Sequence, residues 1–254
     1  MKTLDWIVLA LFFTLLIAIG LWAFRRVKVS KDLYIAGGKL PWWLAGISHH
    51  VSGYSGVVFT GYAAIAYTLG FTIYVWWAAS VAIVLFVGAF LIAPKWVRVR
   101  QRLNVESPTE YLIVRYNLPT QQFVAWIGVL LKLLDTAAKW TSIGILIEGF
   151  TGLPMFYGIL GAGVISMTYV TAGGLWADTA NDLAQFVVQV LAGIAMFVII
   201  GRELGGTAAV FDIWNRLPVE NSMLFREPYS LAFTCTFIFV LFISYNGGTW
   251  NLAT

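Results

Sequence analysis

The sequence predicts an all-α integral membrane protein, and two observations support this fold class. Of the 254 residues, 60% are hydrophobic and only 11% are charged, whereas a soluble domain has about 25% charged residues. A water-soluble fold of this size cannot bury so much apolar surface. The apolar residues also form runs of about 20, the length a helix needs to cross the hydrocarbon core. A soluble enzyme, a disordered chain and a nucleic-acid-binding protein are therefore excluded.

Seven apolar runs are long enough to be membrane helices. The first, residues 4–24, is too long for a signal-peptide core and has no small-residue cleavage site, so we interpret it as a retained helix. Proline is tolerated at helix edges, and Pro41, Pro94, Pro154 and Pro228 lie at the edges of the runs. The other six runs cover about residues 40–69, 73–93, 122–150, 155–171, 182–201 and 229–254.

The distribution of basic residues predicts the orientation. The loops after the first and third runs together contain 10 of the 16 Lys and Arg residues. On the opposite side, the loop over residues 202–228 has three basic and four acidic residues. The positive-inside rule then places the N-terminus outside. We expect a multi-pass protein of the plasma membrane, which is the inner membrane if the source is bacterial.

The loop after the third run contains a helix start signal. Ser107-Pro108-Thr109-Glu110 supplies a hydroxyl cap, a proline in the first turn and an acid near the positive end of the dipole. We therefore expect a short surface helix within residues 98–117, with a structural role.

The second run is interrupted by small and polar residues at membrane depth. Between Ser48 and Gly56 there are three serines, two glycines and the pair His49-His50. Lipid cannot satisfy freed backbone groups, so such a stretch must line a cavity or be buried in protein. Unwound carbonyls there could coordinate a small cation. The alternative is a close helix–helix contact made possible by small residues.

A second interruption precedes the sixth run. Gly173-Gly174 is expected to end the fifth helix, with Asp178 or Asp182 capping the next. Capping is one interpretation of Asp182, and attraction or release of a cation near a membrane entrance is the other. Gln185 and Gln189 follow Asp182 at i+3 and i+7 and form a polar stripe with it.

The fourth run contains three charges on one face, Lys132, Asp135 and Lys139. A charge at membrane depth is costly, so pairing and an inward orientation are expected. A structural ion network is the favoured interpretation, and a role in coupling is the alternative. The single cysteine, Cys235, excludes a disulfide framework within the chain.

With these interruptions in place, the sequence resembles the sodium/solute symporter family, which includes sodium/glucose, sodium/galactose and sodium/proline cotransporters. The resemblance spans nearly the whole chain and depends on the order of its motifs. Those motifs are Leu40-Pro41-Trp42-Trp43-Leu44-Ala45-Gly46-Ile47-Ser48, Ser52-Gly53-Tyr54-Ser55-Gly56, Ser107-Pro108-Thr109-Glu110-Tyr111, Gly173-Gly174-Leu175 and Asn181-Asp182-Leu183-Ala184-Gln185. Gly53 replaces the aspartate of the proline members.

The resemblance implies a leucine-transporter-like fold, in which a lone helix precedes two inverted five-helix repeats. Residues 1–39 would be the lone helix and its basic loop, residues 40–201 the first repeat, and residues 202–254 an extracellular loop and the first helix of the second repeat. The resemblance further implies that a C-terminal half is missing and is needed for a complete site.

Sodium is the coupling ion that the resemblance implies, with no other metal. By alignment, the backbone carbonyls of Val51 and Tyr54 bind the ion, and Asp182 matches an aspartate on the sodium exit route. The family's hydroxyl ligands from a later helix fall beyond Thr254.

The solute-binding positions match the family less well. Trp77 stands at the position of an acidic sugar ligand, Val58 at that of a glutamine and Ser244 at that of an asparagine, whereas Ser80 keeps a serine. In the functional interpretation, the Trp77 ring stacks against the ring of a sugar; in the alternative, it packs within the protein like an ordinary tryptophan. The candidate solute-lining residues are Ser52, Ser55, Val58, Trp77, Ser80, Ser244, Asn246 and Asn251.

The sequence therefore leads us to expect sodium-coupled symport of a small polar organic solute by alternating access, a sugar-like solute being favoured over an amino acid. A proton-coupled transporter and a non-transporting membrane sensor or partner module are the alternatives. A membrane-embedded enzyme is disfavoured because the acidic residues are scattered. The lipid bilayer is the expected environment, and no nucleic-acid partner is expected.

Overall fold

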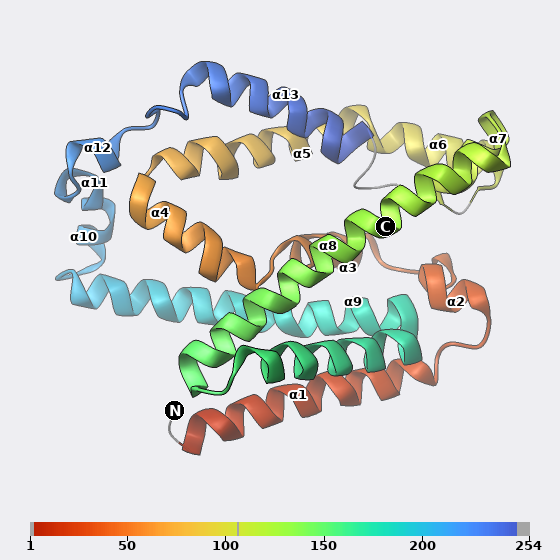
Figure 1. Cartoon of the computed structure of the whole chain (residues 1–254), viewed down its shortest axis with the longest axis horizontal. Helices are drawn as coiled ribbons and strands as arrows, with labels where there is room; N and C mark the ends of the chain where they lie inside the picture. Colours follow the sequence, from red (N-terminus) through yellow and green to blue (C-terminus); the bar gives the residue numbers. More distant parts are fainter. Residues whose placement is uncertain (1–2, 106, 248–254) are drawn as a thin grey trace. The chain divides into compact units, whose positions relative to one another are not determined.

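A computed structural model describes residues 3–105 and 107–247, and its regular elements are helices (Figure 1). Contacts divide the chain into two compact units. The first unit contains the chain up to Thr60 together with Ala138–Ile213, and the second contains Gly61–Ala137 together with the chain from Trp214 onward. By length and composition, Thr3–Phe24, Tyr74–Leu103 and Met155–Glu203 can cross a membrane, and Leu231–Tyr245 is a shorter apolar helix.

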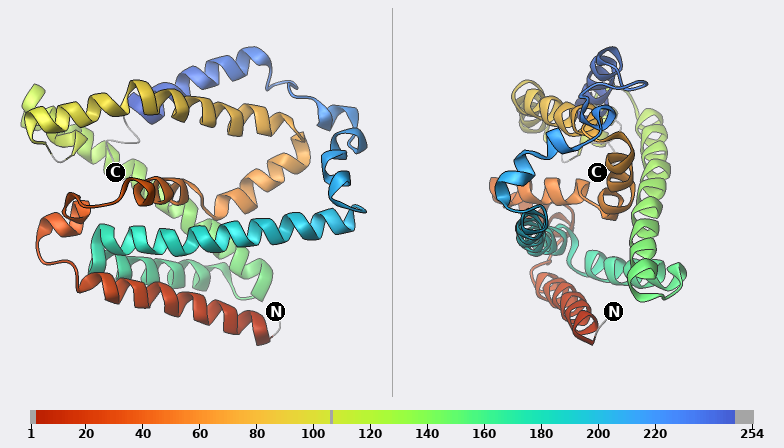
Figure 2. Two further views of the ribbon diagram at one scale, coloured as in Figure 1. Left: turned by 180° about the vertical axis from the view of Figure 1, so that it is seen from behind. Right: turned by 90° about the vertical axis from the view of Figure 1, so that its left-hand side faces the viewer.

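In the first unit, α1 (Thr3–Phe24) lies along the long helix α9 (Met155–Glu203), as Figures 1 and 2 show. The two helices approach closely because small residues face each other: a Cβ atom on Gly173 would lie 2.9 Å from the Cβ of Ala23 and 3.2 Å from the Gly20 carbonyl oxygen. The short helix α2 (Ser30–Ile35), a 3-10 turn (Ala36–Gly38) and α3 (Trp42–Gly53) also pack on α9.

The long helix α9 bends sharply at Gly174, which has φ 55° and ψ −147°. The bend separates the predicted fifth and sixth runs, so the second interruption is confirmed. The sixth run nevertheless begins at residue 175 and not at 182, because a single glycine in this conformation is enough to redirect the chain. Asp178 and Asp182 therefore lie inside the helix, and the prediction that one of them caps it is wrong.

The first unit also contains the end of α8 (Leu118–Thr151), which meets the beginning of α9 in a tight hairpin. Gly158 approaches Gly144 so closely that a Cβ on it would lie 3.0 Å from the Gly144 Cα. Gly152, with φ 75°, turns the chain between them. The last small helix of this unit, α10 (Thr207–Phe211), packs on the far end of α9.

In the second unit, the apolar helix α13 (Leu231–Gly247) packs along α5 (Ser80–Leu91) and the π-helical segment Tyr74–Ala79 before it (Figures 1 and 2). An aromatic cluster fills this contact: Trp76 lies 4.8 Å from Tyr229 and 5.4 Å from Phe237, measured between ring centroids. The other elements of this unit are α4 (Ala63–Leu69), α6 (Ala93–Leu103), α7 (Pro108–Arg115) and α12 (Val219–Ser222). A π-helical segment (Val58–Tyr62) and α11 (Ile213–Arg216) each contain residues of both units.

The surface helix expected after the third run is confirmed as α7. Ser107 caps it, accepting a hydrogen bond from the Glu110 backbone N–H at 3.3 Å, and the Glu110 carboxylate accepts one from the Ser107 N–H at 3.4 Å. This capping box satisfies two backbone donors at the helix start.

We predict that Gly174→Ala destabilises the protein by about 1–3 kcal/mol, the typical cost of a strained backbone conformation. A Cβ atom at this position would also collide with the carbonyl oxygen of Leu33. The matched control is Gly161→Ala on the same helix, where nothing lies within 4 Å of the added methyl group. Unfolding by SDS titration measures both variants, and equal stability of the two would contradict the prediction.

Candidate functional site

The predicted interruption of the second run is confirmed as a break between α3 and the segment that follows it. Helix α3 ends at Gly53, Tyr54 and Ser55 lie outside any helix, and the chain becomes helical again at Gly56. Tyr54 has an extended conformation (φ −98°, ψ 103°), and its N–H donates to the Val51 carbonyl at 2.9 Å. Several carbonyls at the end of α3 are thereby left without a partner in the helix itself.

The end of α8 packs directly on this break. The Lys139 ammonium donates a hydrogen bond to the Ser52 carbonyl oxygen at 3.2 Å. One turn later, a Cβ on Gly56 would lie 3.2 Å from the Ser142 Cβ, so the backbone of the break and α8 almost touch. The positive charge of Lys139 therefore meets the negative end of the α3 dipole, which is a favourable arrangement.

On its other side, α3 is held to α9 by a buried hydrogen bond. The Ser48 hydroxyl donates to the Asp182 carboxylate oxygen at 2.5 Å, and Ser48 and Asp182 are only 8% and 7% exposed. Hydrogen bonds to charged groups are stronger than those between neutral groups. Asp182 therefore connects the helix that breaks with the helix that bends.

A second polar contact lies two turns along α9. The Gln189 amide nitrogen and the His50 Nε2 are 3.3 Å apart, and the His50 ring lies edge-on to Phe186 at 6.0 Å. Within residues 3–105 and 107–247, no group of three or more His, Cys, Asp or Glu side chains is arranged to hold a metal ion. The position of His50 is thus accounted for by packing and an amide partner.

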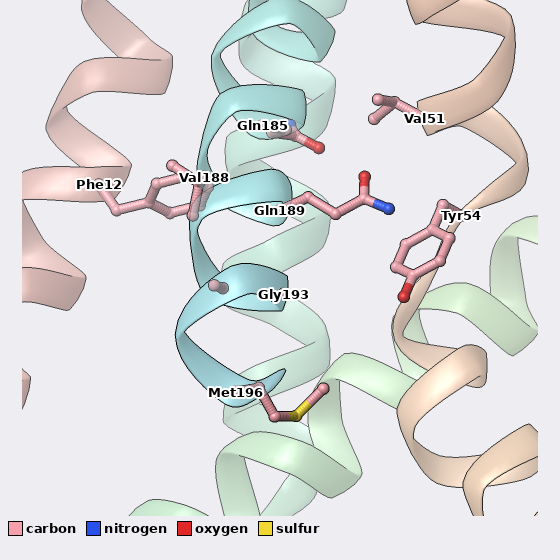
Figure 3. A pocket seen from close by; sticks show the side chains of 9 residues that line it. Phe12, Val51, Tyr54, Gln185, Val188, Gln189, Gly193 and Met196 are labelled. Atoms are coloured by element: carbon pink, nitrogen blue, oxygen red, sulfur yellow. The ribbon is translucent and has the colours of Figure 1, made fainter. Parts of the chain in front are cut away.

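A cavity of about 330 Å³ lies beside these contacts, between α1, α3 and the second half of α9. Figure 3 shows Gln185 and Gln189 of α9 on the side that faces Val51 and Tyr54 of α3, with Phe12 of α1 on the other side. The polar stripe predicted on α9 thus lines this cavity in part. The lining residues are Phe12, Val51, Tyr54, Gln185, Val188, Gln189, Ala192, Gly193 and Met196.

The two residues whose carbonyls are predicted to bind sodium lie on this cavity. The Val51 carbonyl accepts the Tyr54 N–H, and its second lone pair can still coordinate a cation. Nearby on α9, the Asn181 side chain is 1% exposed, and neither of its amide atoms has a hydrogen-bond partner within the described part of the chain.

The other solute-lining candidates of the first unit are Ser52, Ser55 and Val58. Ser52 is exposed and Ser55 half-buried, and the Ser55 hydroxyl accepts a hydrogen bond from the Val57 N–H at 3.3 Å. Val58 is half-buried and begins the π-helical segment after the break.

The remaining candidates belong to the second unit or lie beyond the described side chains. Trp77 packs between Tyr62 and Phe237, at 5.1 and 5.8 Å between ring centroids. Ser80 is fully buried and donates to the Val75 carbonyl at 3.2 Å, and Ser244 is half-buried on α13. Asn251 lies outside the described residues, and the side chain of Asn246 is likewise not described.

Two contacts of the site are not predicted from the sequence: Ser48 with Asp182, and Lys139 with Ser52. Each joins residues far apart in the chain, and the one available signal was the presence of polar residues inside apolar runs. The sequence predicts that Lys139 is paired, and it offers capping or an interaction with a cation for Asp182, but the partners of both residues depend on how the helices pack.

Comparison with known proteins gives a family match over most of the chain. The model of the "Sodium:solute symporter family" matches residues 33–245. The sodium/glucose cotransporter of Vibrio parahaemolyticus is 29% identical over 216 residues, covering 82% of this chain and 38% of the relative. The sodium/sialic acid symporter of Aliivibrio fischeri is 27% identical, covering 96% of this chain and 47% of the relative.

A solved structure shows the same fold. The substrate-bound, outward-open state of a sodium-coupled sialic acid symporter aligns with a TM-score of 0.74 at 21% identity, covering 85% of this chain and 44% of that chain. The leucine-transporter-like fold is therefore confirmed. The chain spans less than half the length of these relatives.

We predict that Ser48→Ala destabilises the protein by about 1–3 kcal/mol, because the buried Asp182 carboxylate loses a donor. Ser166→Ala is the matched control, since the Ser166 hydroxyl donates only to a carbonyl of its own helix, Gly163 O at 3.1 Å. SDS titration measures both variants, and the coupling energy between the two residues follows from Ser48→Ala, Asp182→Asn and the Ser48→Ala/Asp182→Asn double variant. Additive effects would show that the hydrogen bond does not contribute.

Proposed function

Because the chain belongs to the sodium:solute symporter family, we propose that it is the N-terminal part of a sodium-coupled transporter of a small polar organic solute. The observation that carries the proposal is the break at Tyr54–Ser55. Lys139 of α8 contacts the Ser52 carbonyl beside it, and Asp182 of α9 holds the preceding helix α3 through Ser48. Non-helical backbone at membrane depth is found where it lines a cavity or is buried in protein, and in secondary transporters such breaks form the binding sites.

Sodium is the ion in the names of the family and of its relatives, and we propose that this chain supplies two of its ligands. These are the carbonyls of Val51 and Tyr54, which flank the end of α3. Their position beside the 330 Å³ cavity supports the assignment. Asp182, on the same side of α3, is proposed to act on the exit route of the ion.

The proposed solute is sugar-like. Relatives of the chain include transporters named for glucose and sialic acid, both of which are polar and ring-shaped. The exposed or half-buried polar residues near the break, Ser52 and Ser55, can offer hydroxyl groups to such a solute. The proposed set also contains Val58, Trp77, Ser80, Ser244, Asn246 and Asn251.

The transporter is proposed to work by alternating access and to require a C-terminal half that completes the sodium site. The chain covers only 44% of the structural neighbour, which supports the proposal that a further half is required. In the proposed orientation the N-terminus is outside, and the membrane potential drives sodium into the cell. Each charge then supplies about 2.3 kcal/mol per 100 mV, in addition to its concentration gradient. Transport, and not catalysis, is the proposed activity.

We predict that proteoliposomes containing the transporter, with its C-terminal half, take up solute only with an inward sodium gradient. In Asp182→Asn, half-maximal uptake should need about tenfold more sodium, which corresponds to about 1.4 kcal/mol of lost interaction. Asp178→Asn is the matched control, because it removes the same charge one turn earlier on α9. Radiolabelled glucose and sialic acid serve as the tested solutes.

Two outcomes would overturn the proposal. Uptake that continues without sodium and follows a proton gradient would make the protein a proton-coupled transporter. An equal rise of the half-maximal sodium concentration in Asp178→Asn would show that the general charge of α9 matters and that Asp182 has no particular role.

A further inference from the structure

The helix α6 is strongly basic and lies where a membrane helix ends. It has the sequence APKWVRVRQRL, with four basic residues and no acidic one. The segment before it, Tyr74 to Leu91, extends about 27 Å at about 1.5 Å per residue. Because that length is close to the hydrocarbon thickness of roughly 30 Å, α6 begins at the depth of the lipid headgroups.

Three of the four basic residues share one face of α6. Lys95, Arg98 and Arg102 follow one another at spacings of three and four residues, so their side chains lie one above the other. All three are exposed. The fourth, Arg100, lies two residues from Arg98 and therefore points to the opposite side of the helix.

A neighbouring face of α6, about a quarter turn from the basic face, is apolar, and α7 partly covers it. Trp96, Val99 and Leu103 form this face, and the Trp96 ring meets the Tyr111 ring of α7 edge-on at 6.0 Å. Asn104, with φ 51°, turns the chain between the two helices. The basic face therefore lies to one side of the contact with α7.

The cation of α7 is already engaged, which distinguishes it from the basic face. Arg115 donates to the Tyr111 hydroxyl at 2.7 Å, and its guanidinium lies 5.6 Å from the centre of the Tyr116 ring. The Tyr111 hydrogen bond raises the pKa of Arg115, so this group stays charged. Within the part of the chain that the structure describes, no hydroxyl, carboxylate or aromatic ring makes such a contact with Lys95, Arg98 or Arg102.

We propose that the face formed by Lys95, Arg98 and Arg102 binds the phosphate groups of anionic phospholipids. The charge complementarity is direct, since phosphate is a preferred partner of arginine and each basic residue at an anionic surface contributes favourably. The bound lipid fixes α6 against the bilayer surface. This inference does not depend on whether the chain transports a solute.

The test uses the purified chain in detergent with equal amounts of phosphatidylglycerol and phosphatidylcholine that carry the same acyl chains. Native mass spectrometry counts the lipids that remain bound. The wild type should retain phosphatidylglycerol preferentially, and Arg98→Gln and Arg102→Gln should each reduce that preference about fivefold. Arg100→Gln is the matched control, because it removes the same charge from the same helix but from the other face.

Three results would overturn the proposal. They are an absence of preference in the wild type, an equal loss in Arg100→Gln, and displacement of the bound lipid by inorganic phosphate alone. Circular dichroism of each variant separates a lost binding face from a lost fold: a variant with wild-type helicity that still binds phosphatidylglycerol normally counts against the proposed face.

Discussion

The structure depends on one constraint, that backbone groups freed inside a membrane must find partners within the protein. Helix α3 stops at Gly53 in the middle of an apolar run, and its last carbonyls cannot turn to lipid. Some of the partners come from the chain itself, such as the Tyr54 N–H on the Val51 carbonyl. Another comes from α8, whose Lys139 reaches the Ser52 carbonyl. The carbonyls at the end of α3 that remain without a helical partner are the groups that we propose to coordinate the cation.

A related constraint, that a buried charged side chain needs a partner, accounts for the bend in α9. A helix that continued straight through Gly174 would satisfy its own backbone, but it would direct the following residues elsewhere. The left-handed φ of Gly174 redirects the chain beside Leu33, and two turns later Asp182 meets Ser48. The buried carboxylate, which would be expensive without a partner, is thereby given one. One hydrogen bond thus connects the helix that bends, α9, with the helix that ends at the break, α3.

Much of this arrangement could be predicted from the sequence because its signals are local. Contacts between residues far apart in the chain could not be predicted in this way. Apolar length, the prolines at the run edges and the Ser107 capping signal are local, and each corresponds to an observed element. The break near Gly53 was also visible, because glycine and serine at membrane depth contradict a simple helix. The start of the sixth helix was predicted wrongly, because an aspartate after two glycines resembles a cap when its true partner is unknown. That partner, Ser48, is 134 residues away.

The solute-lining residues show where sequence reasoning depends on contacts that it cannot supply. Trp77 replaces an acidic ligand by alignment, and its ring lies between Tyr62 and Phe237. Ser80 keeps its residue type, yet its hydroxyl is occupied by the Val75 carbonyl of the π-helical segment. Matching residue types therefore do not establish a matching site, since a hydroxyl already donated to backbone must exchange that bond before it can hold a solute. The serines beside the break, Ser52 and Ser55, do not bear that cost in the same way: Ser55 accepts rather than donates, so its proton remains available to a ligand.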